Sequence, residues 1–465
     1  MLFNSYEFLF FLLPLVLAGY YLLLPKGWRH GWLALGSYVF YGWWDYRYCG
    51  LLFLATGIDY LAGGRIAATA DPAKRKRWLV LSICCDMGML GFFKYYDLGA
   101  GTANALAQWV GVGALLPLLH LVLPVGISFY TFQSMSYSID IYRGHARPAK
   151  NFIDYACYVS LYPQLVAGPI VRYHEIDNQL RVRTHTWAKA GAGIVLFVLG
   201  LAKKVLLADA VAPIANWGFA QGAIGLVGAW TSLIAYTLQI YFDFSGYSDM
   251  AVGLGLMLGF KFPQNFNSPY KSASISEFWT RWHISLSSWL RDYLYIPLGG
   301  NRRGPVRTYV NLFLTMLLGG LWHGANWTFM LWGAYHGALL ALERMNGKKG
   351  FAWRLPHGGQ VAFTFVLVMV GWILFRAPTL TGFGRIVTGL VGANGWGQAY
   401  PLADAGALNW IIWLFCFVLV FASRNTWEIH WKPGWRLALA LAVLFVVCVG
   451  TFLVNTSSPF LYFQF

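Results

Sequence analysis

Long apolar runs separated by short polar gaps occupy almost the whole chain. A bilayer core requires about 20 apolar residues per helix, and several runs are shorter, so these must be tilted, re-entrant or interfacial. The pattern predicts an all-α, polytopic transmembrane protein with about 11 spans, give or take two, in a single membrane domain over residues 1–465. The runs cover 8–24, 31–44, 49–63, 78–93, 104–142 (two helices), 152–170, 188–208, 224–243, 245–260, 309–320, 322–343, 360–377, 407–423 and 434–454.

The first apolar run, Phe8–Leu24, lacks the basic segment and the small-residue cleavage site of a secretory signal. We therefore expect it to be a retained first helix.

Composition supports the membrane interpretation. Hydrophobic residues make up 58% of the chain and charged residues 11%, and the mean hydropathy is +0.52. An ordinary soluble domain carries about 25% charged residues. Such a chain cannot cover its surface with polar groups in water, which excludes disordered chains, nucleic-acid-binding modules and soluble globules.

The net charge of +16 comes from 34 Lys and Arg against 18 Asp and Glu. The basic residues lie in the gaps between apolar runs, as the positive-inside rule and the anionic cytoplasmic lipid surface require of cytoplasmic loops. Loops without Lys or Arg, at 97–120 and 394–406, are expected on the opposite side, with Gly99–Gly113 and Gly392–Gly406 as flexible segments. The expected cytoplasmic gaps contain Arg65 and Lys74–Arg77, Arg143–Lys150, Arg172–Lys189, Lys261–Arg307, and Arg344, Lys348, Lys349 and Arg354.

The segment Gly319–Asn326 combines four small residues with one histidine in apolar surroundings. His323 lies between two apolar stretches, so we expect it at membrane depth, where ionisable groups are costly and mark function by default. Asn326 follows at i+3, on the same face if the segment is helical. A histidine bonded to a neighbouring helix for packing is an equal alternative. The flanking glycines, which let a backbone or a ligand approach closely, favour function.

A tryptophan-rich segment, Glu277–Ser285, contains Arg281, Trp282 and His283. Glu277 and Arg281 at i,i+4 can form a local ion pair. From spacing alone, the favoured interpretation is an amphipathic surface helix with solvated charges.

A polar stretch from Gln239 to Asp249 interrupts the apolar pattern and includes Asp243, Ser245 and Tyr247. Irregular backbone at membrane depth is tolerated only where protein or a water-filled cavity surrounds it. An ion site and a hydrogen-bond network that holds two helices together are equal explanations of this predicted break.

The sequence contains no motif for nucleotide binding, zinc-dependent hydrolysis or serine-hydrolase catalysis. Walker-type phosphate loops, H-E-x-x-H, G-x-S-x-G and dinucleotide fingerprints are absent, so an ATP-driven pump is not expected. The ten histidines are dispersed and the six cysteines form no C-x-x-C pattern, which predicts no metal site and buried free thiols. Pro124–Tyr130 and Pro163–Arg172 combine proline, glycine and polar residues and predict kinks or breaks that line a channel, with a structural kink favoured.

Taken together, these motifs resemble the membrane-bound O-acyltransferase (MBOAT) family, in its branch of bacterial alginate O-acetyltransferase integral-membrane subunits. The combination of Trp322-His-Gly-Ala-Asn326 with Phe278-Trp-Thr-Arg-Trp-His-Ile-Ser285 is highly specific. The resemblance runs nearly end to end and is poorest between Lys349 and Trp410. The matching stretches are Asn4–Pro25, Leu123–Gly144, Val166–Tyr173, Tyr241–Leu256, Ser276–Asn301, Asn311–Asn326 and Pro459–Phe465.

The resemblance implies a fold with horizontal helices around a central pore, in which the tryptophan-rich segment forms part of the central floor. It implies that His323 is the catalytic histidine and that His283 is the family's second histidine. We expect the substrate and donor channel to involve Asn326, Trp322, Trp282, Arg281, Asp243, Ser245 and Tyr247. No bound cofactor is implied, and acetyl-CoA is the expected donor.

The resemblance also implies a multi-pass protein of the bacterial inner membrane. Acetyl groups would pass from a cytoplasmic donor toward the outside, where partner subunits with a domain like that of SGNH hydrolases attach them to an exopolysaccharide. The lipid bilayer is the other expected partner, and nucleic acid is not.

The expected mechanism rests on the chemistry of a thioester. An acceptor hydroxyl must lose its proton as it attacks the carbonyl, and a neutral imidazole suits a base that works near neutral pH. We therefore expect His323 to be the base and His283 an orienting or electrostatic helper. His283, Asn326 or a backbone N–H would stabilise the oxyanion, and a covalent acetyl-histidine is a further route.

Two alternatives stay open. Acyl transfer to cellulose, peptidoglycan or teichoic acid would use the same machinery. An ion-coupled secondary transporter, with Asp243 and Asp249 as its ion site, belongs to a different class; it predicts inverted hydropathy repeats, which the sequence lacks.

Overall fold

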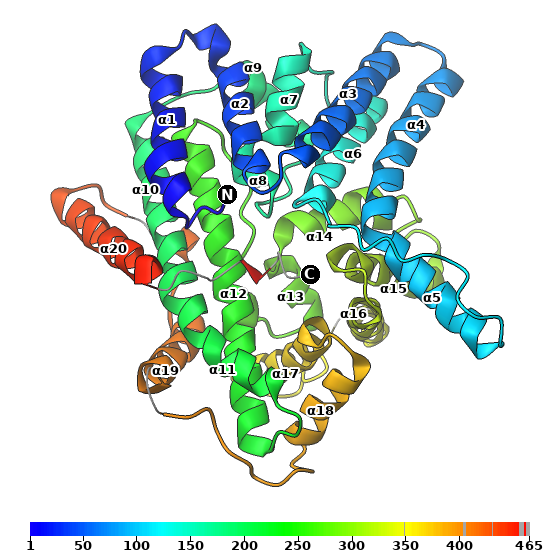
Figure 1. Cartoon of the computed structure of the whole chain (residues 1–465), viewed down its shortest axis with the longest axis vertical. Coiled ribbons are helices and arrows are strands. Elements are labelled where there is room, and N and C mark those ends of the chain that lie inside the picture. Colours follow the sequence, from blue (N-terminus) through cyan, green and yellow to red (C-terminus); the bar gives the residue numbers. More distant parts are fainter. Residues whose placement is uncertain (348, 403–405, 430, 455–459, 462–465) are drawn as a thin grey trace. The chain divides into compact units, whose positions relative to one another are not determined.

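The protein is helical in a computed structural model that describes residues 1–347, 349–402, 406–429, 431–454 and 460–461 (Figure 1). No β-strand occurs among these residues. Four helical segments are long and apolar enough to cross a membrane: Arg47–Ala68, Pro72–Trp109, His357–Arg376 and Trp435–Val454. The expected all-α class is therefore confirmed, whereas the number of about 11 spans stays a prediction. Lys348 and the terminal Pro459 and Tyr462–Phe465, named above, lie outside the described residues.

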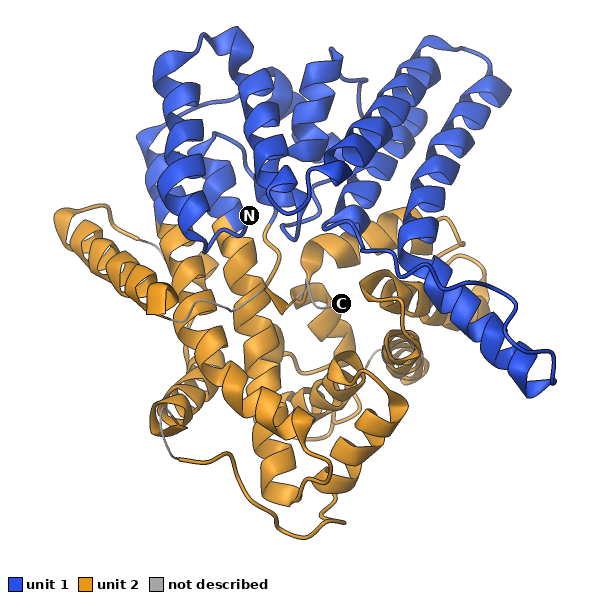
Figure 2. Ribbon diagram, in the orientation of Figure 1, with its two compact units in different colours: residues 1–194, 251–263 blue, residues 195–250, 264–465 orange. Residues whose placement is uncertain are grey.

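The chain divides into two compact units, shown in different colours in Figure 2. Unit 1 comprises residues 1–194 and 251–263, and unit 2 comprises residues 195–250 and 264–465. Two helices, α10 (Trp187–Ala202) and α12 (Leu226–Met257), contribute residues to both units.

Unit 1 begins with one continuous helical segment, Phe8–Leu23, so the apolar run expected to be the first helix is helical. Ser82 ties three of its helices together, because its hydroxyl donates to Asp59 Oδ1 (2.5 Å) and bonds Ser138 Oγ (2.7 Å). Its further helices are α2 (Arg29–Gly42), α3 (Arg47–Ala68), α4 (Pro72–Leu90), α5 (Tyr96–Trp109), α6 (Ile127–Arg143), α7 (Phe152–Ser160), α8 (Tyr162–Leu165) and α9 (Tyr173–Arg181).

The two segments of unit 1 predicted to be kinks lie at helix ends and contact each other. Gly126, at φ +75°, precedes α6, and the chain leaves its helical conformation after α8. A Cβ atom at Gly126 would lie 2.5 Å from the carbonyl oxygen of Leu165. Both the backbone conformation and the contact therefore require glycine at this position.

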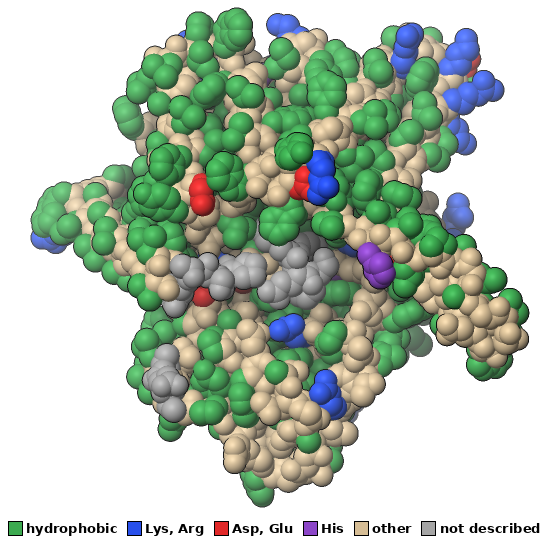
Figure 3. Space-filling view, viewed as in Figure 1, with side chains coloured by type: hydrophobic (Ala, Val, Ile, Leu, Met, Phe, Trp, Pro, Cys, Tyr) green, Lys and Arg blue, Asp and Glu red, His purple; other side chains and the backbone are tan. Residues whose placement is uncertain are grey.

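The surface of unit 1 carries the strongest basic patch of the sequence. Figure 3 shows basic side chains gathered at the turn between α3 and α4, beyond a surface rich in hydrophobic side chains. Arg65, Lys74, Lys76 and Arg77 are exposed there. This arrangement fits a membrane protein whose basic loop faces anionic lipid.

Unit 2 holds the segments that resemble an acyltransferase site. The tryptophan-rich segment is two short helices instead of one, because Trp282 and His283 break it, and His283 adopts φ +43°. The helices are α11 (Asp209–Ala220), α13 (Ile275–Arg281), α14 (Ile284–Leu290), α15 (Gly304–His323), α16 (Trp327–Met345), α17 (His357–Arg376), α18 (Leu380–Leu390), α19 (Gly406–Ala422) and α20 (Trp435–Val454).

Helices α15 and α16 form a close hairpin. A Cβ atom at Gly320 would lie 2.3 Å from the carbonyl oxygen of Phe329, and one at Gly333 would lie 2.4 Å from that of Met316. Small residues at such a crossing let two helix backbones approach, which fixes the end of α15.

The predicted break between Gln239 and Asp249 is wrong, because α12 runs through it as one helix of 32 residues. Lysines from another helical segment neutralise the acidic side chains of α12. Lys204 Nζ lies 2.6 Å from Asp243 Oδ1, and Lys203 Nζ lies 2.6 Å from Asp249 Oδ2. Asp249 also accepts hydrogen bonds from Thr426 and the Trp427 indole. Since side chains from other segments satisfy these carboxylates, the backbone has no need to open.

Two further expectations need correction. The segment Gly99–Gly113 is not a flexible loop over most of its length, because α5 continues to Trp109 and tolerates its glycines. All six cysteines are free, but only Cys157, Cys416 and Cys448 are buried, whereas Cys84 is exposed. In a membrane-embedded chain, exposure on a helix face includes contact with lipid, so an apolar run does not imply burial within the protein.

Candidate active site

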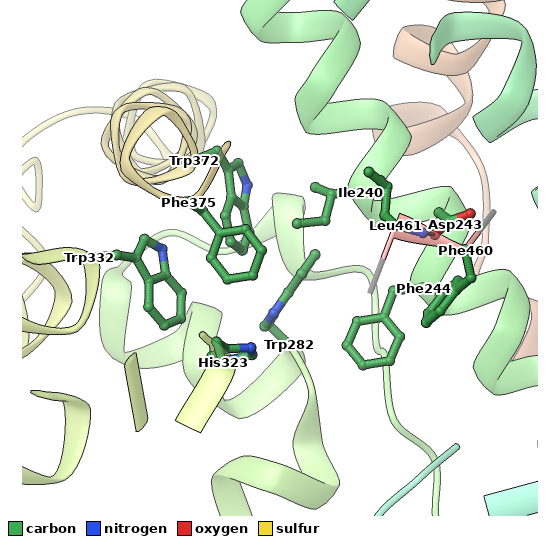
Figure 4. Close-up of a pocket in the computed structure, with 10 residues that line it drawn as sticks. All are labelled: Ile240, Asp243, Phe244, Trp282, His323, Trp332, Trp372, Phe375, Phe460 and Leu461. Carbon is green, nitrogen blue, oxygen red and sulfur yellow. Dashed lines mark hydrogen bonds between the residues drawn. The ribbon is translucent and has the colours of Figure 1, made fainter. Parts of the chain in front are cut away.

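His323 ends α15 and is enclosed by aromatic side chains. It is 5% exposed, and its ring centroid lies 5.1 Å from Trp322, 5.1 Å from Trp332 and 5.2 Å from Phe375. Figure 4 shows Trp282, Trp332 and Phe375 around it, with Asp243, Phe460 and Leu461 grouped on the far side. The hairpin thus holds the imidazole among aromatic side chains, with little of it exposed.

Two hollow spaces of unit 2 meet at His323. The larger is a cavity of about 520 Å³ whose lining includes His323, Trp332, Ser276, Thr315, Arg291 and Arg344. The smaller holds about 10 Å³ and is lined by His323, Trp282, Asp243, Phe244, Phe460 and Leu461, among others. A space of that size admits about one water molecule. His323 therefore borders both a large cavity and a small enclosed space.

His283 is the second histidine of this site. It is 1% exposed, and its ring centroid lies 6.4 Å from that of His323. It lies between two seven-residue helices, outside the four candidate membrane spans. Burial lowers the pKa of His283 to about 3, so its ring is neutral at physiological pH.

Both tryptophans predicted for the channel are buried, and Trp322 contacts both histidines. Trp282 is 3% exposed, packs against Trp372 at 4.8 Å and lines the smaller space. The Trp322 ring lies 6.2 Å from that of His283. This burial excludes the solvated surface helix that spacing alone favoured.

Arg281 lines neither space. The predicted i,i+4 pair is confirmed, because its Nε donates to Glu277 Oε1 at 2.9 Å. Its Nη1 donates to the carbonyl of Asn267 at 3.3 Å. Arg281 thus ties α13 to the segment before it.

Asn326 does not share a helical face with His323, because the segment between them is not helical and the condition for a shared face is not met. The helix ends at His323 because Gly324 is extended, at φ −158° and ψ 149°. The Asn326 side chain instead caps α16, accepting a hydrogen bond from Thr328 N at 3.1 Å, and its amide donates to Pro378 O at 3.0 Å. Both ends of the side chain are therefore engaged away from the histidine.

The polar residues of α12 are divided between the site and its surroundings. Asp243 lines the smaller space and accepts a hydrogen bond from the backbone N–H of Leu461 at 2.9 Å. Ser245 and Tyr247 are buried but line neither space, and the Tyr247 ring packs 4.6 Å from that of Phe460. Of the three predicted residues, only Asp243 reaches the site.

Asn265 is a site residue that sequence analysis missed. Its side-chain oxygen lies 3.2 Å from His283 Nδ1, and it also accepts hydrogen bonds from Ser285. A polar residue in the semi-polar gap after Lys261 was the only available signal. Trp332 and Phe375 were missed as well, although a hairpin turn after His323 would bring the next helix back beside it.

The described residues include no group of three or more His, Cys, Asp or Glu side chains placed to hold a metal ion. His283 is in ring contact with His323, and the ion-paired Asp243 lines the smaller space with it. The arrangement suits proton transfer by imidazole in a site shielded from water.

Comparison with known proteins agrees with this geometry. The family model described as the membrane-bound O-acyltransferase family matches residues 145–348, a range that includes both histidines. A probable alginate O-acetylase AlgI of Azotobacter vinelandii is 48% identical over 85% of this chain and 79% of its own length. One from Pseudomonas putida is 43% identical over the full length of both chains. A peptidoglycan O-acetyltransferase of Helicobacter pylori is 37% identical over 85% of this chain and 80% of its own. These similarities show that the chain belongs to the membrane-bound O-acyltransferase family.

Proposed function

We propose that this membrane acyltransferase takes acetyl from a cytoplasmic thioester and passes it across the bacterial inner membrane for O-acetylation of an exopolysaccharide, with alginate as the acceptor polymer. The names of its relatives support acetyl transfer to a polymer. The observation that carries the proposal is the position of His323, a buried imidazole where a large cavity ends against a narrow second space.

The larger cavity suits the donor. Its volume of about 520 Å³ lies within the roughly 300–1,000 Å³ usual for ligand pockets. Trp332 and Arg344 both line it and are separated along α16 by about 18 Å, at about 1.5 Å per residue. A long thioester arm can therefore reach from the arginines to the histidine.

The charge of the cavity favours an anionic donor on the cytoplasmic side. Arg291 and Arg344 line it, and basic residues mark the cytoplasmic face of membrane proteins. Guanidinium groups bind phosphate through charge-assisted hydrogen bonds. Acetyl-CoA, a thioester that carries phosphates, is thus the donor we propose.

His323 acts as the base in this proposal. The acceptor hydroxyl gives its proton to a neutral ring nitrogen of His323 while its oxygen bonds to the thioester carbonyl carbon. The carbon–sulfur bond then breaks, and the leaving thiolate takes up the proton. Trp322, Trp332 and Phe375 keep bulk water from the thioester, which limits hydrolysis.

The acceptor hydroxyl belongs to the periplasmic side in this proposal. Subunits with an SGNH-hydrolase-like domain would collect the acetyl group there and attach it to the polysaccharide. The smaller space beside Asp243 holds only about one water molecule, so a larger acceptor group enters by displacing the side chains that line it.

The transporter alternative is less favoured. Both acidic residues of its ion site are neutralised, Asp243 by Lys204 and Asp249 by Lys203, each at 2.6 Å. A carboxylate with a lysine counter-ion has little need of a transported cation.

Replacing His323 tests the proposed function. His323→Ala is expected to abolish polymer-bound acetate in cells, with the protein still folded and inserted in the membrane. His357→Ala, at the exposed start of α17, removes an imidazole away from the cavity and is the matched control. Wild-type acetylation by His323→Ala would refute the proposal. Acetate bound to peptidoglycan instead of alginate would reassign the acceptor.

A further inference from the structure

Asn265 is the centre of the hydrogen bonds around His283. Its backbone carbonyl accepts from Ile284 N at 2.9 Å, and its side-chain nitrogen donates to Ser248 Oγ at 2.8 Å. Its side-chain oxygen accepts from the backbone N–H of Ser285 at 3.2 Å and from Ser285 Oγ at 2.9 Å. A backbone N–H can only donate, so the atom facing Ser285 must be the amide oxygen.

The same oxygen fixes the proton on His283. It lies 3.2 Å from His283 Nδ1, and an amide oxygen can only accept a hydrogen bond. Nδ1 therefore carries the ring proton. Because the buried ring is neutral, Nε2 then has a free lone pair and can only accept.

The other ring nitrogen of His283, Nε2, is buried and has no hydrogen bond from the described part of the chain. Phe244 of α12, Phe266 of the preceding segment and Trp322 of α15 surround the ring, with centroids at 4.7, 6.3 and 6.2 Å. His323 is the titratable side chain in ring contact with it. A buried acceptor without a partner in the protein is available to a donor that arrives with the reactants.

We propose that Asn265 is a positioning residue that locks His283 in the Nδ1–H form, so that Nε2 accepts a hydrogen bond from the hydroxyl that reacts at His323. This inference rests on the proposed function for its reaction and on geometry for the form of the ring. It replaces our expectation that His283 stabilises the oxyanion, since an oxyanion requires a donor. His283 orients the hydroxyl, and His323 takes its proton.

An amide suits this role better than a carboxylate. A neutral amide selects the ring form without favouring the charged ring, whereas a carboxylate beside a histidine favours the imidazolium. A protonated His283 would donate from both nitrogens and lose the acceptor. The left-handed backbone of His283, at φ +43°, shows that the ring's position is held against local strain.

The decisive variant is Asn265→Asp, which keeps the size and the acceptor oxygen but adds a charge beside Nδ1. A neighbouring opposite charge raises a histidine pKa by roughly one to three units. Since His283 is then protonated below a higher pH, acetylation on the acidic side should be lost at a higher pH than in the wild type. Asn267→Asp is the matched control, because that residue contacts Arg281 through its backbone.

A second measurement reads the ring directly and does not depend on activity. In ¹⁵N-histidine-labelled protein, His283, assigned by loss of its signals in His283→Gln, should show one protonated nitrogen and one bare nitrogen. Correlation with the ring carbons should identify the bare nitrogen as Nε2. Asn265→Ala should mix the two forms while the protein stays folded.

The outcomes separate the two proposals. A bare Nδ1 in the wild type, or an Asn265→Asp profile that matches Asn267→Asp, would overturn the role of Asn265. An equal loss of activity at every pH would also overturn it and leave Asn265 as a structural residue. Retained activity in His323→Ala would overturn the proposed function instead, and the ¹⁵N spectrum would still report the ring form.

Discussion

Replacing Lys204 with methionine should strongly destabilise unit 2. Lys204 Nζ lies 2.6 Å from Asp243 Oδ1 and 2.8 Å from Asp209 Oδ1. The side chains of Lys204 and Asp243 are only 3% and 2% exposed. Methionine preserves most of the buried aliphatic stem but removes the charge, which leaves the Asp243 carboxylate without its counter-ion beside the smaller space.

The expected loss follows from this burial. Removing one partner of a buried ion pair costs about 3–5 kcal/mol, because the remaining charge stays desolvated. Asp243 keeps its hydrogen bond from the backbone N–H of Leu461, and Asp209 is 20% exposed and can be solvated. We therefore expect a loss of about 3 kcal/mol, at the lower end of that range.

Thermal unfolding of the detergent-purified protein measures this effect. The double variant Lys204→Met with Asp243→Asn removes both charges but keeps an oxygen for Leu461 N, and it should recover most of the lost stability. Arg47→Met breaks the exposed pair with Asp45 and should leave the unfolding temperature unchanged. If the double variant is as unstable as Lys204→Met alone, the unpaired charge is not the cause and the reasoning fails.

Two other predictions follow from the site. Gly333→Val should push the two helices of the α15–α16 hairpin apart, because a Cβ atom there would lie 2.4 Å from Met316 O. The free energy of unfolding should fall by about 1–3 kcal/mol, and acetylation should be lost. Unchanged stability in thermal unfolding would contradict the close crossing. Arg344→Glu should raise KM for acetyl-CoA, the donor proposed above, about tenfold or more with little change in kcat, since it removes the proposed charge-assisted contact. Steady-state kinetics would refute this if the exposed Arg354→Glu had the same effect.

Apolar length was a sound guide to individual helices. The runs at 8–24 and 360–377 correspond to helical segments Phe8–Leu23 and His357–Arg376, because a long apolar run in a bilayer satisfies its backbone only as a helix. Polar residues within an apolar run were a poor guide to where a helix is interrupted. Asp243 and Asp249 suggested an interrupted helix, but their partners, Lys203 and Lys204, come from a different segment that no local pattern connects to them.

At the site, too, features that depend on contacts between distant segments could not be predicted from the local sequence. Resemblance, and not spacing, united His283 with His323, since the sequence between them gives no sign of where the chain folds back. The break at His283 was not predictable, because a non-glycine residue at φ +43° is uncommon and depends on its surroundings. Asn265 has the same limitation: its role depends on three contacts made after the loop folds.

The segment Lys203–Ala208 is a π-helical turn, a widened stretch with hydrogen bonds that span five residues. Adjacent side chains of an α-helix point about 100° apart. Lys203 and Lys204 nevertheless form ion pairs with Asp249 and Asp243, which both belong to α12. A wider turn has more residues per turn, so the angle between successive side chains is smaller than in an α-helix, which favours this arrangement. Shortening the segment by one residue would restore a regular helix and rotate one ammonium group away from its aspartate. The length of the segment Lys203–Ala208 is therefore expected to matter as much as the identity of its two lysines.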